Sequence, residues 1–173
     1  MCPVFFPAGG KGDMQLVQHV DVTSNTTSVS FTGLNINADG YYVLMGGGRN
    51  ETGNVVIYKI YANNDTTDTN YYSQKFQAGG TDLFYNRQNL PLFSRVGIGE
   101  HASFFSLIYL DPEQHMRSLT HTSTGTPSSM YLIYYYATSV STFTNITRID
   151  ITADQTDGIR AGSWFTLYKL VKS

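Results

Sequence analysis

The sequence predicts an all-β fold, a two-sheet antiparallel β-sandwich with an extended N-terminal arm. Only 14% of its 173 residues are charged, against about a quarter in ordinary globular domains, and Thr, Ser, Asn, Gly and Tyr take their place. Short runs of β-branched and aromatic residues recur between turn residues at the spacing typical of sandwich strands. Helical periodicity is absent over any useful length. The length of 173 residues fits a single domain.

The first thirteen residues are expected to form the arm, because they contain two prolines and a glycine-rich stretch and show no periodicity. The arm includes an apolar cluster of Val4, Phe5 and Phe6. Two interpretations stay open: the arm folds over its own sandwich, or it docks on a neighbouring subunit. The sandwich domain is expected to cover residues 14–173.

Each later element is predicted from its own pattern. The first strand begins at Met14 and is expected to place Leu16, Val20 and Val22 on one face. The next strand alternates, with Val29 and Phe31 facing inward. The third ends in a flexible glycine run at 46–48. Nine or ten strands are typical of a sandwich of the jelly-roll type. Those from the second onward are expected at 27–33, 41–45, 55–62, 71–76, 102–110, 116–122, 130–137, 146–153 and 163–171.

Two of these strands, at 130–136 and 55–58, are apolar on both faces. An antiparallel sandwich strand needs only one dry face. The other face is therefore expected to meet an overlying loop or another subunit. Tyrosine suits the second case, because its ring is large and its hydroxyl keeps a polar partner. The candidate oligomer or partner interface consists of the arm cluster Val4, Phe5 and Phe6 together with Tyr131, Tyr134, Tyr135, Tyr136 and Trp164.

Residue patterns that carry chemistry are few. Cys2 is the only cysteine, which excludes an intrachain disulfide and a cysteine-based zinc site. His115 and His121 are expected on one strand about 20 Å apart, too far to share a metal ion. The loop at 63–70 offers oxygen ligands that suit Ca²⁺, but a loop pinned by side-chain to backbone hydrogen bonds explains it as well. No enzyme and no cofactor are expected.

The net charge and the lack of targeting signals argue against further classes of protein. The net charge of −2 disfavours nucleic-acid binding, which needs clustered Lys and Arg. Neither a signal peptide nor a membrane-spanning run is expected. The single cysteine favours a reducing compartment.

Several segments resemble a jelly-roll domain of structural proteins in tailed phages, over about Met14 to Ser173. The closing stretch is the most specific, with alternating isoleucines at 146–151 followed by an Ala-Gly-Ser-x-Phe-x-Leu-Tyr pattern at 161–168. The segments at 25–34, 63–71 and 117–119 are similar to the opening strand, the polar loop and the mid-domain Arg-Ser-Leu of that family. The arm and Trp164 depart from it. The resemblance implies a virion component and no catalytic residues.

We therefore expect a non-enzymatic virion structural protein, foremost a capsid decoration (cement) protein. It would be made in the host cytoplasm, would self-associate as a homotrimer and would bind the major capsid protein or other virion proteins on the capsid surface or tail. The alternative is a tail-fibre, receptor-binding or carbohydrate-binding module that contacts a host surface glycan. In that case Tyr71 and Tyr72 are the candidate ligand-facing aromatics. An enzyme such as a depolymerase ranks third.

Overall fold

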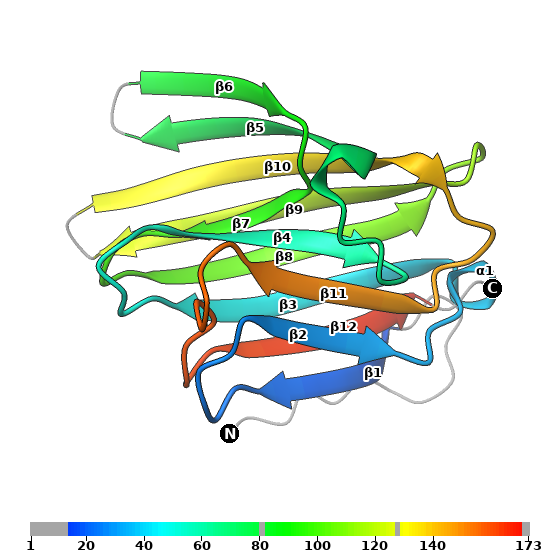
Figure 1. Ribbon diagram of the computed structural model, residues 1–173, viewed down its shortest axis with the longest axis horizontal. Helices are drawn as coiled ribbons and strands as arrows, with labels where there is room; N and C mark the ends of the chain where they lie inside the picture. The colour runs from blue at the N-terminus through cyan, green and yellow to red at the C-terminus, as the bar shows by residue number, and fades with distance from the viewer. Residues whose placement is uncertain (1–13, 80–81, 127–128, 171–173) are drawn as a thin grey trace.

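The protein is a β-sandwich of one eight-stranded and one four-stranded antiparallel sheet (Figure 1). The computed structural model describes residues 14–79, 82–126 and 129–170, so the expected N-terminal arm lies outside the described residues. The large sheet has the order β1-β12-β3-β8-β9-β10-β5-β6, and the small sheet has the order β2-β11-β4-β7. The predicted all-β class and two-sheet architecture are confirmed.

The described chain contains twelve strands and two short helices. The strands of the large sheet are β1 (Met14–Asp21), β3 (Tyr41–Arg49), β5 (Tyr71–Gly79), β6 (Asp82–Gln88), β8 (His101–Leu110), β9 (His115–Thr126), β10 (Ser129–Thr142) and β12 (Trp164–Leu170). Those of the small sheet are β2 (Ser28–Thr32), β4 (Val56–Ala62), β7 (Leu92–Val96) and β11 (Arg148–Ala153). The helices are α1 (Ile36–Asp39) and a 3-10 turn, η1 (Asp68–Asn70).

The main core lies between the two sheets. Alternate side chains of strands from both sheets point into it, and Phe31, Tyr58 and Phe165 are fully buried there. Aromatic pairs fill its centre, with the ring centroids of Phe104 and Phe165 5.5 Å apart. The predicted inward positions Val29 and Phe31 are confirmed.

A smaller core cluster lies towards one edge of the sandwich. It consists of Leu92 from β7 and of Ile133 and Tyr135 from β10, with Ile57, Leu90 and Tyr131 packed against it. The small sheet ends at β7, whereas the large sheet continues through β5 and β6 (Figure 1). The inner face of β5 therefore projects past the edge of the small sheet.

Two local predictions were wrong. A bulge in β1 between Leu16 and Gln18 turns Leu16 to the face opposite Val20 and Val22, so that Leu16 is 60% exposed. The glycines at 46–48 do not end their strand, because β3 continues through them to Arg49. A Cβ atom at Gly46 would lie 2.3 Å from the Phe104 ring, so the glycines make room for packed aromatic side chains.

Candidate interaction surface

The outer face of the large sheet, turned away from the small sheet, carries two adjacent rows of mostly apolar side chains. In each row the residues are cross-strand partners on neighbouring strands from β1 to β5, which spans roughly 30 Å at the usual strand spacing. The first row contains His19, Thr166, Met45, Phe105, His121, Tyr134 and Phe76. The second row contains Leu16, Tyr168, Val43, Leu107, Leu119, Tyr136 and Gln74.

Most of the exposed large apolar side chains of the described residues lie on this face. Of the thirteen that are exposed, all except Ile98 and Val140 belong to it or to its margins. Phe105 is 45% exposed, Leu119 51% and Tyr134 44%. Single exposed hydrophobic residues are ordinary on a protein surface, but a contiguous set of this size is typical of an interaction site. We call this set the apolar face.

Neighbouring side chains hold the aromatic rings of the apolar face in place. The His121 ring stacks on Tyr134, with centroids 4.9 Å apart. The Arg117 guanidinium lies 5.9 Å from the Tyr136 ring centroid and donates a hydrogen bond from Nε to Asp111 at 2.7 Å. Burial opposes the charge of Arg117, but the hydrogen bond to Asp111 and the interactions with the Asp111 and Tyr136 side chains together outweigh it and raise the Arg117 pKa. The face therefore carries little unpaired charge at this point.

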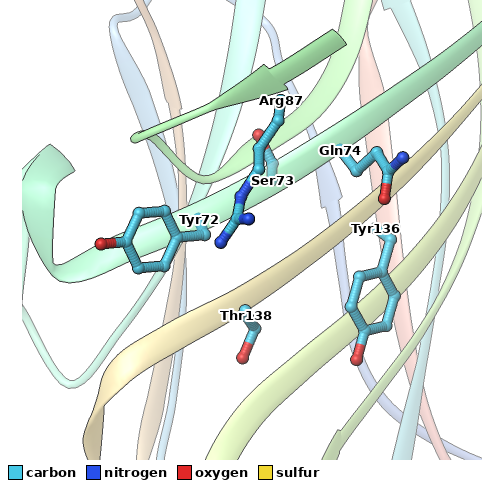
Figure 2. Close-up of a pocket in the computed structure, with 6 residues that line it drawn as sticks. All are labelled: Tyr72, Ser73, Gln74, Arg87, Tyr136 and Thr138. Atoms are coloured by element: carbon cyan, nitrogen blue, oxygen red, sulfur yellow. The ribbon is translucent and has the colours of Figure 1, made fainter. Parts of the chain in front are cut away.

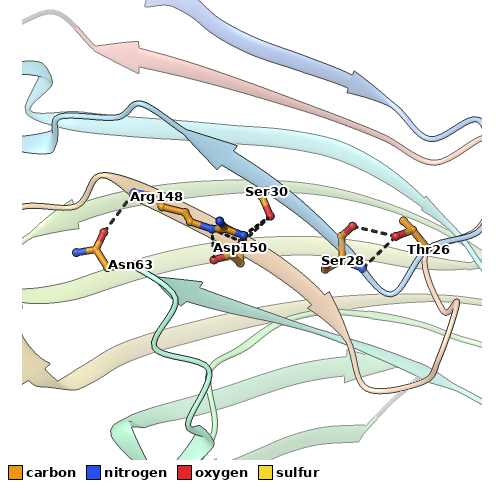
Figure 3. Close-up of polar contacts among 6 residues, drawn as sticks. All are labelled: Thr26, Ser28, Ser30, Asn63, Arg148 and Asp150. Carbon is orange, nitrogen blue, oxygen red and sulfur yellow. Dashed lines mark hydrogen bonds and ion pairs between the residues drawn. The ribbon is translucent and has the colours of Figure 1, made fainter.

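The outer face of the small sheet has the opposite character (Figure 3). Arg148 donates from Nε to both carboxylate oxygens of Asp150, at 2.8 and 2.9 Å, and Ser30 Oγ donates to Asp150 at 2.6 Å. Asn63 Oδ1 accepts from the backbone N–H of Arg148 at 3.2 Å. These polar groups satisfy one another. The apolar face of the large sheet thus contrasts with a polar, hydrogen-bonded outer face on the small sheet.

The structure divides the predicted interface residues into three groups. Tyr134, Tyr136 and Trp164 lie on the apolar face, at 44%, 38% and 39% exposure. Tyr131 and Tyr135 point to the other side of β10 and pack in the smaller core cluster, where Tyr135 is 1% exposed. These two are not available to a partner on that face, and for the fully buried Tyr135 the prediction of an interface residue is wrong. Val4, Phe5 and Phe6 lie outside the described residues.

The second strand predicted to be apolar on both faces is covered within the chain. Val56 and Tyr58 of β4 are buried between the sheets. Ile57 points the other way and packs against the smaller core cluster. For β4, the structure therefore favours the intrachain cover of the two alternatives.

The two candidate ligand-facing tyrosines also separate. Tyr71 is fully buried, and its hydroxyl accepts from the Ala62 N–H at 3.1 Å and donates to the Asp65 carbonyl at 3.0 Å. Burial raises its pKa. Tyr71 therefore cannot contact a ligand as predicted, because alternation along β5 turns it inward and its neighbour outward.

Tyr72 faces outward and lines a shallow pocket of about 190 Å³ with Arg87 and Tyr136 (Figure 2). The Arg87 guanidinium lies 5.1 Å from the Tyr72 ring centroid. Ser73, Gln74 and Thr138 complete the lining. The pocket combines aromatic rings with hydrogen-bonding groups at one end of the apolar face.

The polar loop at 63–70 is held by its own side chains. Asn70 Nδ2 donates to both carboxylate oxygens of Asp65 at 2.9 Å. Asp68 accepts from Lys59 Nζ at 2.7 Å and from Tyr61 Oη at 2.6 Å. The loop pinned by hydrogen bonds is thus the interpretation that the structure favours over a Ca²⁺ site. Across residues 14–79, 82–126 and 129–170, no three His, Cys, Asp or Glu side chains are grouped to hold a metal ion.

Several residues of the apolar face were not identified from the sequence, among them Met45, Phe76, Phe105 and Leu119. A signal for Phe105 was present, because Phe104 and Phe105 are consecutive in β8 and only one of two such neighbours can face the core. Met45 and Leu119 can be assigned to the apolar face only from the cross-strand register, which places Met45 beside Phe105 and Leu119 beside Tyr136.

Comparisons with protein-family models, with curated proteins and with solved structures found no match to this chain. The resemblance to tailed-phage jelly-roll domains therefore stays an expectation that rests on the sequence motifs. None of the helices in the described ranges has the length and apolar character needed to cross a bilayer.

Proposed function

We propose that the protein is a non-enzymatic virion structural protein of the capsid decoration type, which self-associates through the apolar face. The apolar face is the observation that carries the self-association. The virion setting is supported by the motifs at 146–151 and 161–168. Under this proposal, copies of the chain, as a homotrimer, cover the apolar face of one another, and the assembly binds other virion proteins.

The size of the apolar face supports a subunit interface. Its eleven large apolar side chains are between 37% and 72% exposed. With about 150–250 Å² for a large aromatic side chain and less for the others, they expose on the order of 900 Å². A monomer's largest apolar patch is typically about 300–600 Å², and a standard interface buries about 800 Å² on each partner. The face is large enough for a stable contact.

The experiment measures the mass of the full chain in solution by sedimentation equilibrium. A variant combines Phe105→Ser, Leu119→Ser and Tyr134→Ser, which all lie at the centre of the apolar face. The matched control is Ile98→Ser, which removes a side chain that is 58% exposed outside the face. We expect a trimer for the wild type and the control and a folded monomer for the triple variant. A wild-type monomer at high concentration would refute the proposed self-association.

The virion setting is tested separately. In purified particles that contain the protein, we expect cryo-electron microscopy to locate copies on the capsid shell. Copies confined to the tail tip would contradict capsid decoration and would favour the tail-fibre alternative.

The pocket of Tyr72, Arg87 and Tyr136 favours one second candidate, a carbohydrate-binding or receptor-binding module. Sugars are bound by aromatic rings together with nearby hydrogen-bonding groups, and this pocket offers both (Figure 2). A glycan array tests it. Binding that is lost in Tyr72→Ala and Tyr136→Ala but kept in Ile98→Ser would support this candidate, and an array without binding would exclude it.

A further inference from the structure

A second pocket lies away from the apolar face, where the inner face of β5 and β10 projects past β7. It has a volume of about 360 Å³. Lys75 of β5 and Tyr135 of β10 line it from the large sheet, and Ile57, Leu92 and Arg95 line it from the small sheet. Because the two sheets contribute opposite walls, the packing of one sheet against the other forms the pocket.

Two cations of this pocket have no acidic partner among the described residues. Lys75 donates a hydrogen bond to Gln77 Oε1 at 3.1 Å but forms no ion pair, and Arg95 forms neither an ion pair nor a side-chain hydrogen bond within that part of the chain. By contrast, Lys59, at the same pocket, is paired with Asp68 at 2.7 Å. Burial and the nearby positive charge of Arg95 lower the pKa of Lys75. Two neighbouring cations that form no ion pair make a site suited to an anion.

Tyr135 adds a buried hydroxyl that lacks a hydrogen-bond partner. It is 1% exposed, and its hydroxyl has no hydrogen-bond partner among the described residues. Buried hydroxyl groups in native proteins are nearly always paired, and an unpaired one costs about 1–3 kcal/mol. The guanidinium of Arg95 is close enough to act on the Tyr135 pKa, although burial dominates and raises it. Two cations without an ion pair and one buried hydroxyl without a hydrogen-bond partner, from three different strands, therefore converge on one pocket.

The remaining wall limits the kind of anion. Ile57, Leu90 and Leu92 give the pocket an apolar side that suits a carbon skeleton. Asp154 also lines it, and its Oδ1 accepts from the Ile57 N–H at 2.9 Å. With Lys59 paired and Asp154 present, the net charge of the pocket is about that of one cation, which matches a monoanion better than a phosphate dianion.

We propose that this pocket binds a small organic monocarboxylate with a ring-sized body. The guanidinium of Arg95 and the ammonium of Lys75 bind the carboxylate, the first with the planar geometry that suits two carboxylate oxygens. The hydroxyl of Tyr135 donates to it as well. The ring packs against Ile57, Leu90 and Leu92. This inference goes beyond the proposed function, since the pocket shares no residue with the centre of the apolar face.

The test is a titration of the full chain followed by amide chemical shifts, with four probes: glucuronate, benzoate, glucose and inorganic phosphate. We expect glucuronate or benzoate to shift amide signals of β5 and β7. Tighter binding of glucuronate would identify the ring of the ligand as a sugar, and tighter binding of benzoate would identify it as an apolar ring. Glucose is neutral and should not bind. Failure of both carboxylates to bind, or tighter binding of phosphate than of either, would overturn the proposal.

Variants assign the binding to named groups. Arg95→Gln and Lys75→Met are each expected to weaken carboxylate binding at least tenfold. Arg87→Gln is the matched control, because Arg87 stacks on Tyr72 at 5.1 Å much as Arg95 stacks on Tyr131 at 5.9 Å. Tyr135→Phe removes only the unsatisfied hydroxyl, so the free protein should be as stable as the wild type or more stable, yet bind more weakly. Equal binding by Arg95→Gln and the wild type would refute the assignment.

Discussion

Replacement of Gly46 by alanine tests the packing between β3 and its neighbours. The added Cβ atom would lie 2.3 Å from Cζ of Phe104 and 2.6 Å from the backbone oxygen of Trp164. Real Cβ atoms do not approach other atoms this closely, so the ring and the β12 backbone must both move. Overpacking of this kind costs about 1–3 kcal/mol. For a domain of this length, 2 kcal/mol lowers the melting temperature by about 4–8 °C.

The assay is thermal and urea denaturation of the Gly46→Ala and Gly53→Ala variants. Gly53 is the matched control, because a Cβ atom there meets no atom within 4 Å. Alanine at Gly53 should leave stability unchanged or raise it by up to about 1 kcal/mol through the unfolded state. Phe104→Leu should cost less in the Gly46→Ala background than in the wild type, since it relieves the clash. A Gly46→Ala protein as stable as the wild type would refute this account of the glycine run.

Three further predictions concern stability. Asp111→Asn should cost about 1–3 kcal/mol at neutral pH in urea denaturation, because Asp111 accepts from the His115 N–H at 2.9 Å and from Arg117 Nε at 2.7 Å. Burial opposes its ionisation, yet these bonds hold the Asp111 pKa below its usual range, so the difference should begin to shrink as the pH falls below about 4 and disappear only below the lowered pKa. Asn63→Ala should lower the free energy of unfolding by about 2–4 kcal/mol, measured by thermal denaturation, and should lower it more than Asn63→Gly does. The Asn63 side chain bonds Thr147 and Asn145, and its φ of 53° suits Asn or Gly. Burial raises the pKa of Tyr58 to about 12. Tyrosinate absorbance should therefore show Tyr58 still protonated after the exposed tyrosines have ionised near pH 10. The free energy of unfolding should fall as the pH rises above 10, because Tyr58 ionises more readily in the unfolded chain.

The strands that could be predicted are those in which one face alone is apolar. In β2, Val29 and Phe31 alternate with serines and threonine, so both the strand and its inward face follow from the sequence. The two missed strands, β6 and β7, lack such a pattern. Arg87, Asn86 and Gln88 make the described end of β6 polar, and β7 is mostly buried over only five residues.

Faces were mistaken where the sequence has no contrast or where the register changes. Tyr134, Tyr135 and Tyr136 are identical residues in succession, so nothing local decides that Tyr135 alone points to the core. The pairing of Tyr135 with Lys75 and Thr120 decides it. For Leu16, the bulge in β1 breaks the period of two, and a bulge has no sequence signal at this position. The pocket of Lys75, Arg95 and Tyr135 could not be predicted, because its walls come from separate strands, β4, β5, β7 and β10, which only the fold brings together.

The two edges of the large sheet bear on how the protein can associate. One edge is β1, whose bulge breaks the regular row of backbone donors and acceptors that a foreign strand would need. The other edge is β6, where Arg87 places a charge. Both features discourage growth of the sheet by lateral addition of chains. Under the proposed self-association, copies meet through faces of the sandwich and not through sheet edges, which guards a concentrated population of this tyrosine-rich chain against growth of a continuous sheet.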